Sequence, residues 1–158
     1  MNVTTATATI DTPSTTTTTT TTRTRLPLLR VGALAGVAAA VATELVAAVA
    51  RVGDVSMKAG SIGADSSESI PVLGFAFSTL LWTAVGIGIA AAMGRWAKHP
   101  ARTFTITAVA LTIVSFVPPA LAGATTTGTK LILALTHVVA ALIVIPVLRH
   151  ELNNRASR

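Results

Sequence analysis

The chain has 158 residues, of which 51% are hydrophobic and only 11% are charged, and its mean hydropathy is +0.70. Soluble domains carry roughly 25% charged residues, so this composition excludes a protein whose whole surface faces water. The net charge of +6 comes from basic residues that flank apolar segments, an arrangement that argues against nucleic acid as a partner. The absence of cysteine excludes disulfides and thiolate chemistry.

Residues 1–25 form a tail dominated by threonine, with an unbroken run from Thr15 to Thr22. Such a segment cannot bury enough apolar surface to offset the entropy lost on ordering, so we expect a disordered tail. An O-glycosylated stalk is the alternative if this tail lies outside the cell.

Four apolar segments follow, at about residues 28–50, 70–93, 104–122 and 131–148. Each is close to the roughly 20 residues that a helix needs to cross a bilayer. Their alanine and glycine content suits close helix packing in lipid. The sequence therefore predicts an all-α, four-helix transmembrane bundle over residues 28–151. Pro118 and Pro119 should kink or end the third helix.

The orientation of the bundle follows from the rule that cytoplasmic flanks are rich in Lys and Arg. One side carries nine basic residues: Arg23, Arg25, Arg30, Arg95, Lys98, Arg102, Arg149, Arg155 and Arg158. The other side carries Arg51, Lys58 and Lys130. Both termini are therefore predicted to be cytoplasmic.

The first span also resembles a signal peptide in one respect, because Ala48-Val49-Ala50 matches a small-x-small cleavage site. Its apolar region is longer than the roughly 7–15 residues of a signal peptide. We therefore favour a retained span.

Glu44 is the single charged residue within the first span from Val31 to Ala50. Gly32, Gly36, Ala40 and Glu44 recur every four residues, which places them near one face of a helix. Gly32 and Gly36 form a GxxxG pattern that is typical of close helix packing. We expect this face to turn toward the other helices.

Polar residues of the other spans lie at a depth similar to that of Glu44. They are His137 in the fourth span, Ser115 in the third, and Ser78 and Thr79 in the second. The sequence predicts a polar layer centred on Glu44 and His137, either as an ion pair or as a neutral hydrogen-bonded pair. The pair would act as a packing device or as a proton or substrate site, and a third possibility is that Glu44 reaches the outer interface.

The sequence predicts no catalytic residues, no cofactor and no metal site. Asp54, Asp65 and Glu68 share a polar loop without an accompanying histidine, so a solvated loop is the favoured interpretation. Haem ligation by His137 would need a second histidine at a matching depth, and His99 and His150 lie near the cytoplasmic edge.

Four short motifs stand out: Arg102-Thr103-Phe104, Ser115 followed by Pro118-Pro119, Thr136-His137-Val138-Val139-Ala140-Ala141, and Leu81-Trp82-Thr83-Ala84-Val85-Gly86. They resemble an uncharacterised family of small actinobacterial four-span membrane proteins, catalogued as a domain of unknown function, over about residues 28–151. The resemblance implies four helices and an integral membrane location. It implies no activity and no catalytic residues.

We expect a small multi-pass protein of the bacterial plasma membrane that acts as a structural or interaction protein, or as a subunit of a complex. Its partners would be the lipid bilayer and either a second copy or another membrane protein. The alternative is a proton-coupled carrier or small-solute transporter that uses Glu44 and His137. An enzyme is the least favoured class.

The predicted orientation can be checked by cysteine labelling, because the chain has no cysteine of its own. Single substitutions Thr125→Cys and Lys98→Cys place a thiol in an outer and an inner loop, respectively. A membrane-impermeant reagent added to intact cells should label position 125 and spare position 98. Labelling at position 98 from outside would reverse the orientation.

Overall fold

The computed structural model describes residues 26–157, so the predicted disordered tail lies outside the described residues. Its elements are α1 (Leu26–Val52), β1 (Lys58–Ala59), β2 (Glu68–Ser69), α2 (Gly74–Trp96), α3 (Pro100–Val114), α4 (Val117–Leu121) and α5 (Thr127–Ala156). Four helical segments are long and apolar enough to cross a membrane: Pro27–Val52, Gly74–Trp96, Pro100–Leu121 and Thr127–Ala156. The predicted all-α four-helix fold is confirmed.

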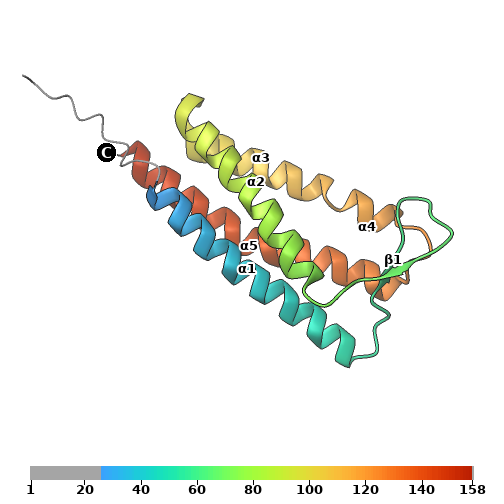
Figure 1. Ribbon diagram of the computed structural model, residues 1–158. Helices are drawn as coiled ribbons and strands as arrows, with labels where there is room; N and C mark the ends of the chain where they lie inside the picture. The colour runs from blue at the N-terminus through green and yellow to red at the C-terminus, as the bar shows by residue number, and fades with distance from the viewer. Residues whose placement is uncertain (1–25, 158) are drawn as a thin grey trace, which may run out of the picture.

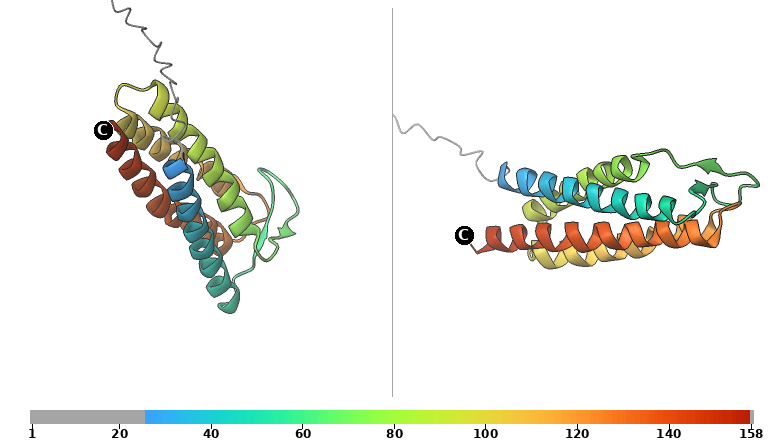
Figure 2. Two further views of the ribbon diagram at one scale, coloured as in Figure 1. Left: turned by 60° about the vertical axis from the view of Figure 1, so that its left-hand side comes forward. Right: turned by 90° about the horizontal axis from the view of Figure 1, so that it is seen from below.

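The helices run alternately up and down the bundle (Figure 1). Figure 2 shows α1 and α5 side by side, with the start of α1 and the end of α5 at the same end of the molecule. We call this the termini end, and the opposite end, which carries β1 and β2, the hairpin end. Which side of a membrane each end faces stays a prediction.

Several helix boundaries differ from those expected from hydropathy. The third helix begins at Pro100, before the apolar segment, because a proline is well suited to the first helical position, where its missing N–H costs nothing. The fourth extends from Thr127 to Ala156 and continues through Pro146. Polar residues at both ends of an apolar segment can continue a helix, so hydropathy underestimates its length.

The third span is broken where its two prolines predict a break. Helix α3 ends at Val114, and α4 begins at Val117. Pro118 and Pro119 have no N–H to donate to the carbonyls four residues earlier, so the regular helical ladder stops there.

The sequence favoured a solvated loop between the first two spans, but the structure has a short hairpin in this segment. Strands β1 and β2 pair antiparallel, with Lys58 opposite Ser69, and form a short hairpin. Ile62 bridges to Ala122, and Gly60 N–H donates to Thr125 Oγ1 over 2.9 Å. The hairpin is thereby attached to the connection between α4 and α5.

Two glycines allow this attachment. A Cβ on Gly60 would overlap the carbonyl oxygen of Gly123, and a Cβ on Gly123 would overlap the backbone of Ala64. Their close approach places the hairpin across the end of the bundle (Figure 1).

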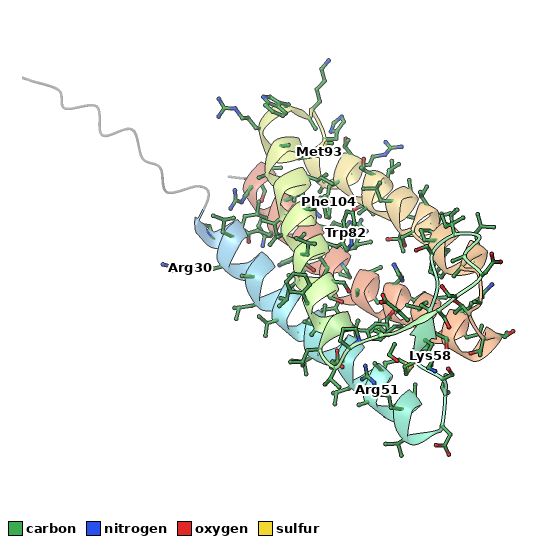
Figure 3. The ribbon with its side chains drawn as sticks, turned by 45° about the vertical axis from the view of Figure 1, so that its right-hand side comes forward. Arg30, Arg51, Lys58, Trp82, Met93 and Phe104 are labelled. Carbon is green, nitrogen blue, oxygen red and sulfur yellow. The ribbon has the colours of Figure 1, made fainter. Side chains whose placement is uncertain are left out.

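The buried residues form two clusters at opposite ends. The termini-end cluster contains Leu28, Ala90, Ala101, Phe104, Leu148 and Leu152. Figure 3 shows Phe104 and Met93 of this region where α2 and α3 approach each other. The hairpin-end cluster contains Ala47, Ala50, Met57 and Phe75, which come from α1, the hairpin segment and α2. Between α2 and α3, packing is therefore tight at the termini end only.

The small-residue face of α1 lies against α2 and α5. A Cβ on Gly32 would lie 2.7 Å from Ile87 Cγ1, and one on Gly36 would lie 2.9 Å from Thr83 Cγ2. Ala40, one turn further along, is only 4% exposed. These three residues leave α2 room to approach α1 closely.

Substitution Gly36→Leu should weaken this contact. The stiff, β-branched Thr83 cannot move aside easily, so overpacking should lower the free energy of unfolding by about 1–3 kcal/mol. Gly88→Leu is the matched control, because a Cβ there meets nothing within 4 Å. Titration of the purified protein with a denaturing detergent, followed by circular dichroism, measures both. Equal stability of the two variants would contradict the packing role of Gly36.

Candidate functional site

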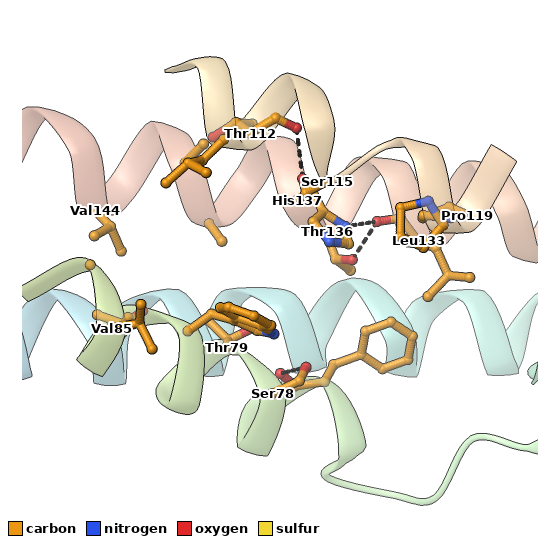
Figure 4. Close-up of a pocket in the computed structure, with 18 of the residues that line it drawn as sticks. Ser78, Thr79, Val85, Thr112, Ser115, Pro119, Leu133, Thr136, His137 and Val144 are labelled. Carbon is orange, nitrogen blue, oxygen red and sulfur yellow. Dashed lines mark hydrogen bonds between the residues drawn. The ribbon is translucent and has the colours of Figure 1, made fainter. Parts of the chain in front are cut away.

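A cavity of about 800 Å³ lies between α2, the broken third span and α5. Hairpin residues Ala59 and Gly60 line it at the hairpin end, and Val144 and Ile145 of α5 line it toward the termini end. Figure 4 shows the cavity with α2 on one side and α3 and α5 on the other. Its walls are mostly apolar, with a few hydroxyl groups and one histidine.

The cavity exists because α2 and α3 diverge from their short connection at the termini end (Figure 1). Small residues on the lining, Gly86, Ala108, Ala140 and Ala141, do not fill the resulting space. The break at Ser115 removes a regular helical wall on one side. Helix α2 also stays close to α1, and the contacts that hold it there include Glu44.

Glu44 accepts three hydrogen bonds near the hairpin end of α1. Its Oε1 accepts from Arg51 Nη1 at 3.0 Å and from the backbone N–H of Leu73 at 3.2 Å. Its Oε2 accepts from the N–H of Ala76 at 3.2 Å. Arg51 also donates to the carbonyl of Pro71 at 3.3 Å. Figure 3 shows Arg51 near the first turn of α2.

These bonds make Glu44 an N-terminal cap for α2 that is supplied by another helix. Leu73 is the N-cap residue of α2 and has no side-chain oxygen to bind the free N–H groups of the first turn. It also has φ 67°, a left-handed conformation that a leucine rarely adopts. The Glu44 carboxylate lies at the positive end of the helix dipole and accepts from two of these N–H groups, those of Leu73 and Ala76, and its bonds hold this turn against α1.

His137 has different partners. Its Nδ1 lies 2.6 Å from the carbonyl oxygen of Leu133, one turn earlier on α5. Its ring lies beside Phe116, with ring centroids 6.1 Å apart. Among residues 26–157, no hydrogen bond or ion pair joins His137 to Glu44. The prediction of a direct Glu44–His137 pair is therefore wrong.

The physical reason is that Glu44 faces the start of α2, whereas His137 faces the cavity. Similar depth in the bilayer does not specify which side of a helix a residue occupies. The polar layer is thus divided into a capping group around Glu44 and a cavity group.

The cavity brings together the other four residues of the expected layer: Ser78, Thr79, Ser115 and His137. Figure 4 shows Ser115 and His137 close together, with Ser78 and Thr79 across the cavity on α2. Thr79 also bonds to Thr43 of α1, with 3.1 Å between the two hydroxyl oxygens.

Sequence reasoning did not assign three residues to these two groups: Thr43, Arg51 and Thr136. Arg51 lies just beyond the apolar segment of the first span, but its spacing of seven residues from Glu44 is about two helical turns and indicates a shared face. Thr136 is adjacent to His137 and 5% exposed, but a threonine in an apolar span gives no specific signal. Within the described part of the chain, no group of three or more His, Asp or Glu residues is placed to hold a metal ion.

Removing the cap should destabilise the bundle. Glu44→Ala removes the acceptor of the N–H groups of Leu73 and Ala76 and of Arg51 Nη1, so we expect a loss of about 2 kcal/mol or more in the free energy of unfolding. Asp65→Ala removes an exposed carboxylate at the same end and should change stability little. Detergent-induced unfolding of both variants measures the difference. A Glu44→Ala protein as stable as Asp65→Ala would contradict the capping role.

Comparison with known proteins places the chain in a family but gives it no function. No curated protein and no solved structure matches it. The model of a family of unknown function, DUF6069, matches residues 23–154, which include both polar groups and the four helical segments except the last two residues of α5. This chain, with its four helices long and apolar enough to cross a membrane, therefore belongs to the family of unknown function DUF6069.

Proposed function

We propose that this protein is a non-enzymatic interaction protein of the bacterial plasma membrane, and that its binding site is the cavity between α2, α3–α4 and α5. The observation that carries the proposal is the size and lining of that cavity. At about 800 Å³, it lies within the roughly 300–1,000 Å³ typical of sites for small molecules. A mostly apolar lining with a few grouped polar atoms is also typical of such sites.

The position of the cavity supports an apolar guest that comes from within the bilayer. Its walls are segments long and apolar enough to span a membrane, and the hairpin lies across one end. Exposed side chains such as Trp82 and Leu111 lie at its edges. A guest entering between α2 and α3 would exchange lipid contacts for helix contacts without crossing a polar surface.

The alternative of a proton-coupled carrier required Glu44 and His137 to act together. Glu44 is bonded to Arg51 and to the first turn of α2, and it is not among the residues that line the cavity. No observation favours the carrier over the binding protein. Association with a second copy of the chain or with another membrane subunit stays a prediction.

A pair of glycines on α2 tests the proposal. Gly86 lines the cavity and Gly88 does not, and a Cβ at either position meets nothing within 4 Å. Gly86→Leu should fill part of the cavity, whereas Gly88→Leu adds the same side chain on an exposed face. Both substitutions raise helix propensity equally, so a difference between them reports on the cavity.

The measurement uses a photoactivatable alkyl diazirine and the full-length protein in lipid nanodiscs. Saturable labelling of cavity residues such as Ala108 and Val144 is expected in the wild type and in Gly88→Leu. It should fall about tenfold in Gly86→Leu, which corresponds to roughly 1.4 kcal/mol of lost apolar contact. Non-saturable labelling that is equal in all three proteins would overturn the proposed function.

A further inference from the structure

Most hydroxyl groups that line the cavity donate their hydrogen bond to a backbone carbonyl of their own helical segment. Ser115 Oγ donates to the carbonyl of Thr112 over 2.6 Å, and Thr136 Oγ1 donates to that of Leu133 over 2.8 Å. Ser78 and Thr112 make bonds of the same kind within their own helices, at 3.1 and 2.8 Å. Because a carbonyl oxygen only accepts, the hydroxyl is the donor in each contact.

The hydroxyl of Thr79 also acts as a donor, but its acceptor lies on the neighbouring helix α1. Thr43 Oγ1 donates to the carbonyl of Ala40, so in its contact with Thr79 the Thr79 hydroxyl is the donor. Each of these oxygens keeps lone pairs that can still accept a hydrogen bond.

His137 is also left as an acceptor. Its Nδ1 faces the carbonyl of Leu133, so Nδ1 carries the proton of that bond. In the neutral ring the other nitrogen, Nε2, then has a free lone pair. His137 lines the cavity, and Figure 4 shows it beside Ser115 and Thr136. Three acceptors therefore lie together on the wall formed by α3 and α5: Nε2 of His137 and the hydroxyl oxygens of Ser115 and Thr136.

The lining carries no Asp, Glu, Lys or Arg, and its remaining side-chain donors are the Trp82 indole and the Thr83 hydroxyl. An ammonium or phosphate group would lie in this cavity without an opposite charge, which is costly in an apolar setting. A ketone or an ether has no hydrogen to donate to the acceptors of Ser115, Thr136 and His137. A neutral hydroxyl is the group that complements the wall.

We propose that the cavity binds a lipophilic alcohol. This inference rests on the proposed function and names the guest. The alcohol hydroxyl donates to Nε2 of His137 or to the oxygens of Ser115 and Thr136. Its hydrocarbon part extends along the apolar walls toward Val144 and Ile145, a distance of roughly 12 Å along α5 at 1.5 Å per residue.

The test compares an alcohol with its methyl ether, which keeps the oxygen and loses the donor. Dodecanol and dodecyl methyl ether each compete with the alkyl diazirine for the full-length protein in nanodiscs. The loss of one hydrogen bond should make the ether about fivefold weaker. His137→Ala should weaken the alcohol and leave the ether unchanged, and His150→Ala, at an exposed position outside the cavity, should change neither.

His137→Gln keeps the test valid if the alanine variant fails to fold. Its amide oxygen is an acceptor, so part of the preference for the alcohol should return. A diacylglycerol that competes as well as dodecanol would support a membrane lipid as the source of the hydroxyl. Competition by dodecanol alone would support a free alcohol.

The inference and the proposed function fail in different ways. If alcohol and ether compete equally, the cavity binds apolar guests, but the assignment of an alcohol is overturned. If neither competes and labelling by the diazirine is not saturable, the proposed function fails as well. If His137→Ala weakens alcohol and ether alike, His137 shapes the cavity without accepting a hydrogen bond, and the assignment is again overturned.

Discussion

The capping of α2 by Glu44 is the interaction on which the arrangement of the helices depends. The first N–H groups of a helix have no partner within the helix, and Leu73 offers no side chain to bind those of α2. Glu44 supplies the acceptor from α1, and Arg51 balances its charge at 3.0 Å. The cost of placing a carboxylate in an apolar span is offset because all of its partners are fixed nearby.

This cap has a consequence on the opposite side of α2. Glu44 and the close approach at Gly36 draw α2 toward α1, so α2 cannot also pack along the whole length of α3. The two helices meet near Phe104 and separate toward the hairpin end. The cavity is the space that results, and the hairpin, attached through Gly60, lies across its end. Packing of α2 against α1 thus leaves a cavity between α2 and the third span.

The sequence was sufficient for the fold class because continuous apolar segments of about 20 residues can satisfy their backbone hydrogen bonds in lipid as α-helices. It also predicted the break before Pro118, since a missing N–H acts locally. It did not predict the hairpin, because two-residue strands depend on glycine contacts with a distant loop. Depth along a span placed Ser115, His137 and Glu44 in one layer; the first two line the same cavity, but depth could not show that Glu44 faces α2. That distinction depends on rotation about the helix axis, which apolar, alanine-rich faces do not specify.

The most direct measurement is the distance between α2 and the third span when the cap is removed. Spin labels at Phe77→Cys and Val114→Cys, both exposed positions, report this separation by pulsed electron resonance in nanodiscs. In Glu44→Ala, α2 should be released from α1, and the distance distribution should broaden and shift relative to the wild type. The matched Asp65→Ala protein should keep the wild-type distribution. An unchanged distribution in Glu44→Ala would contradict the account, because the cavity would then be held open without the cap.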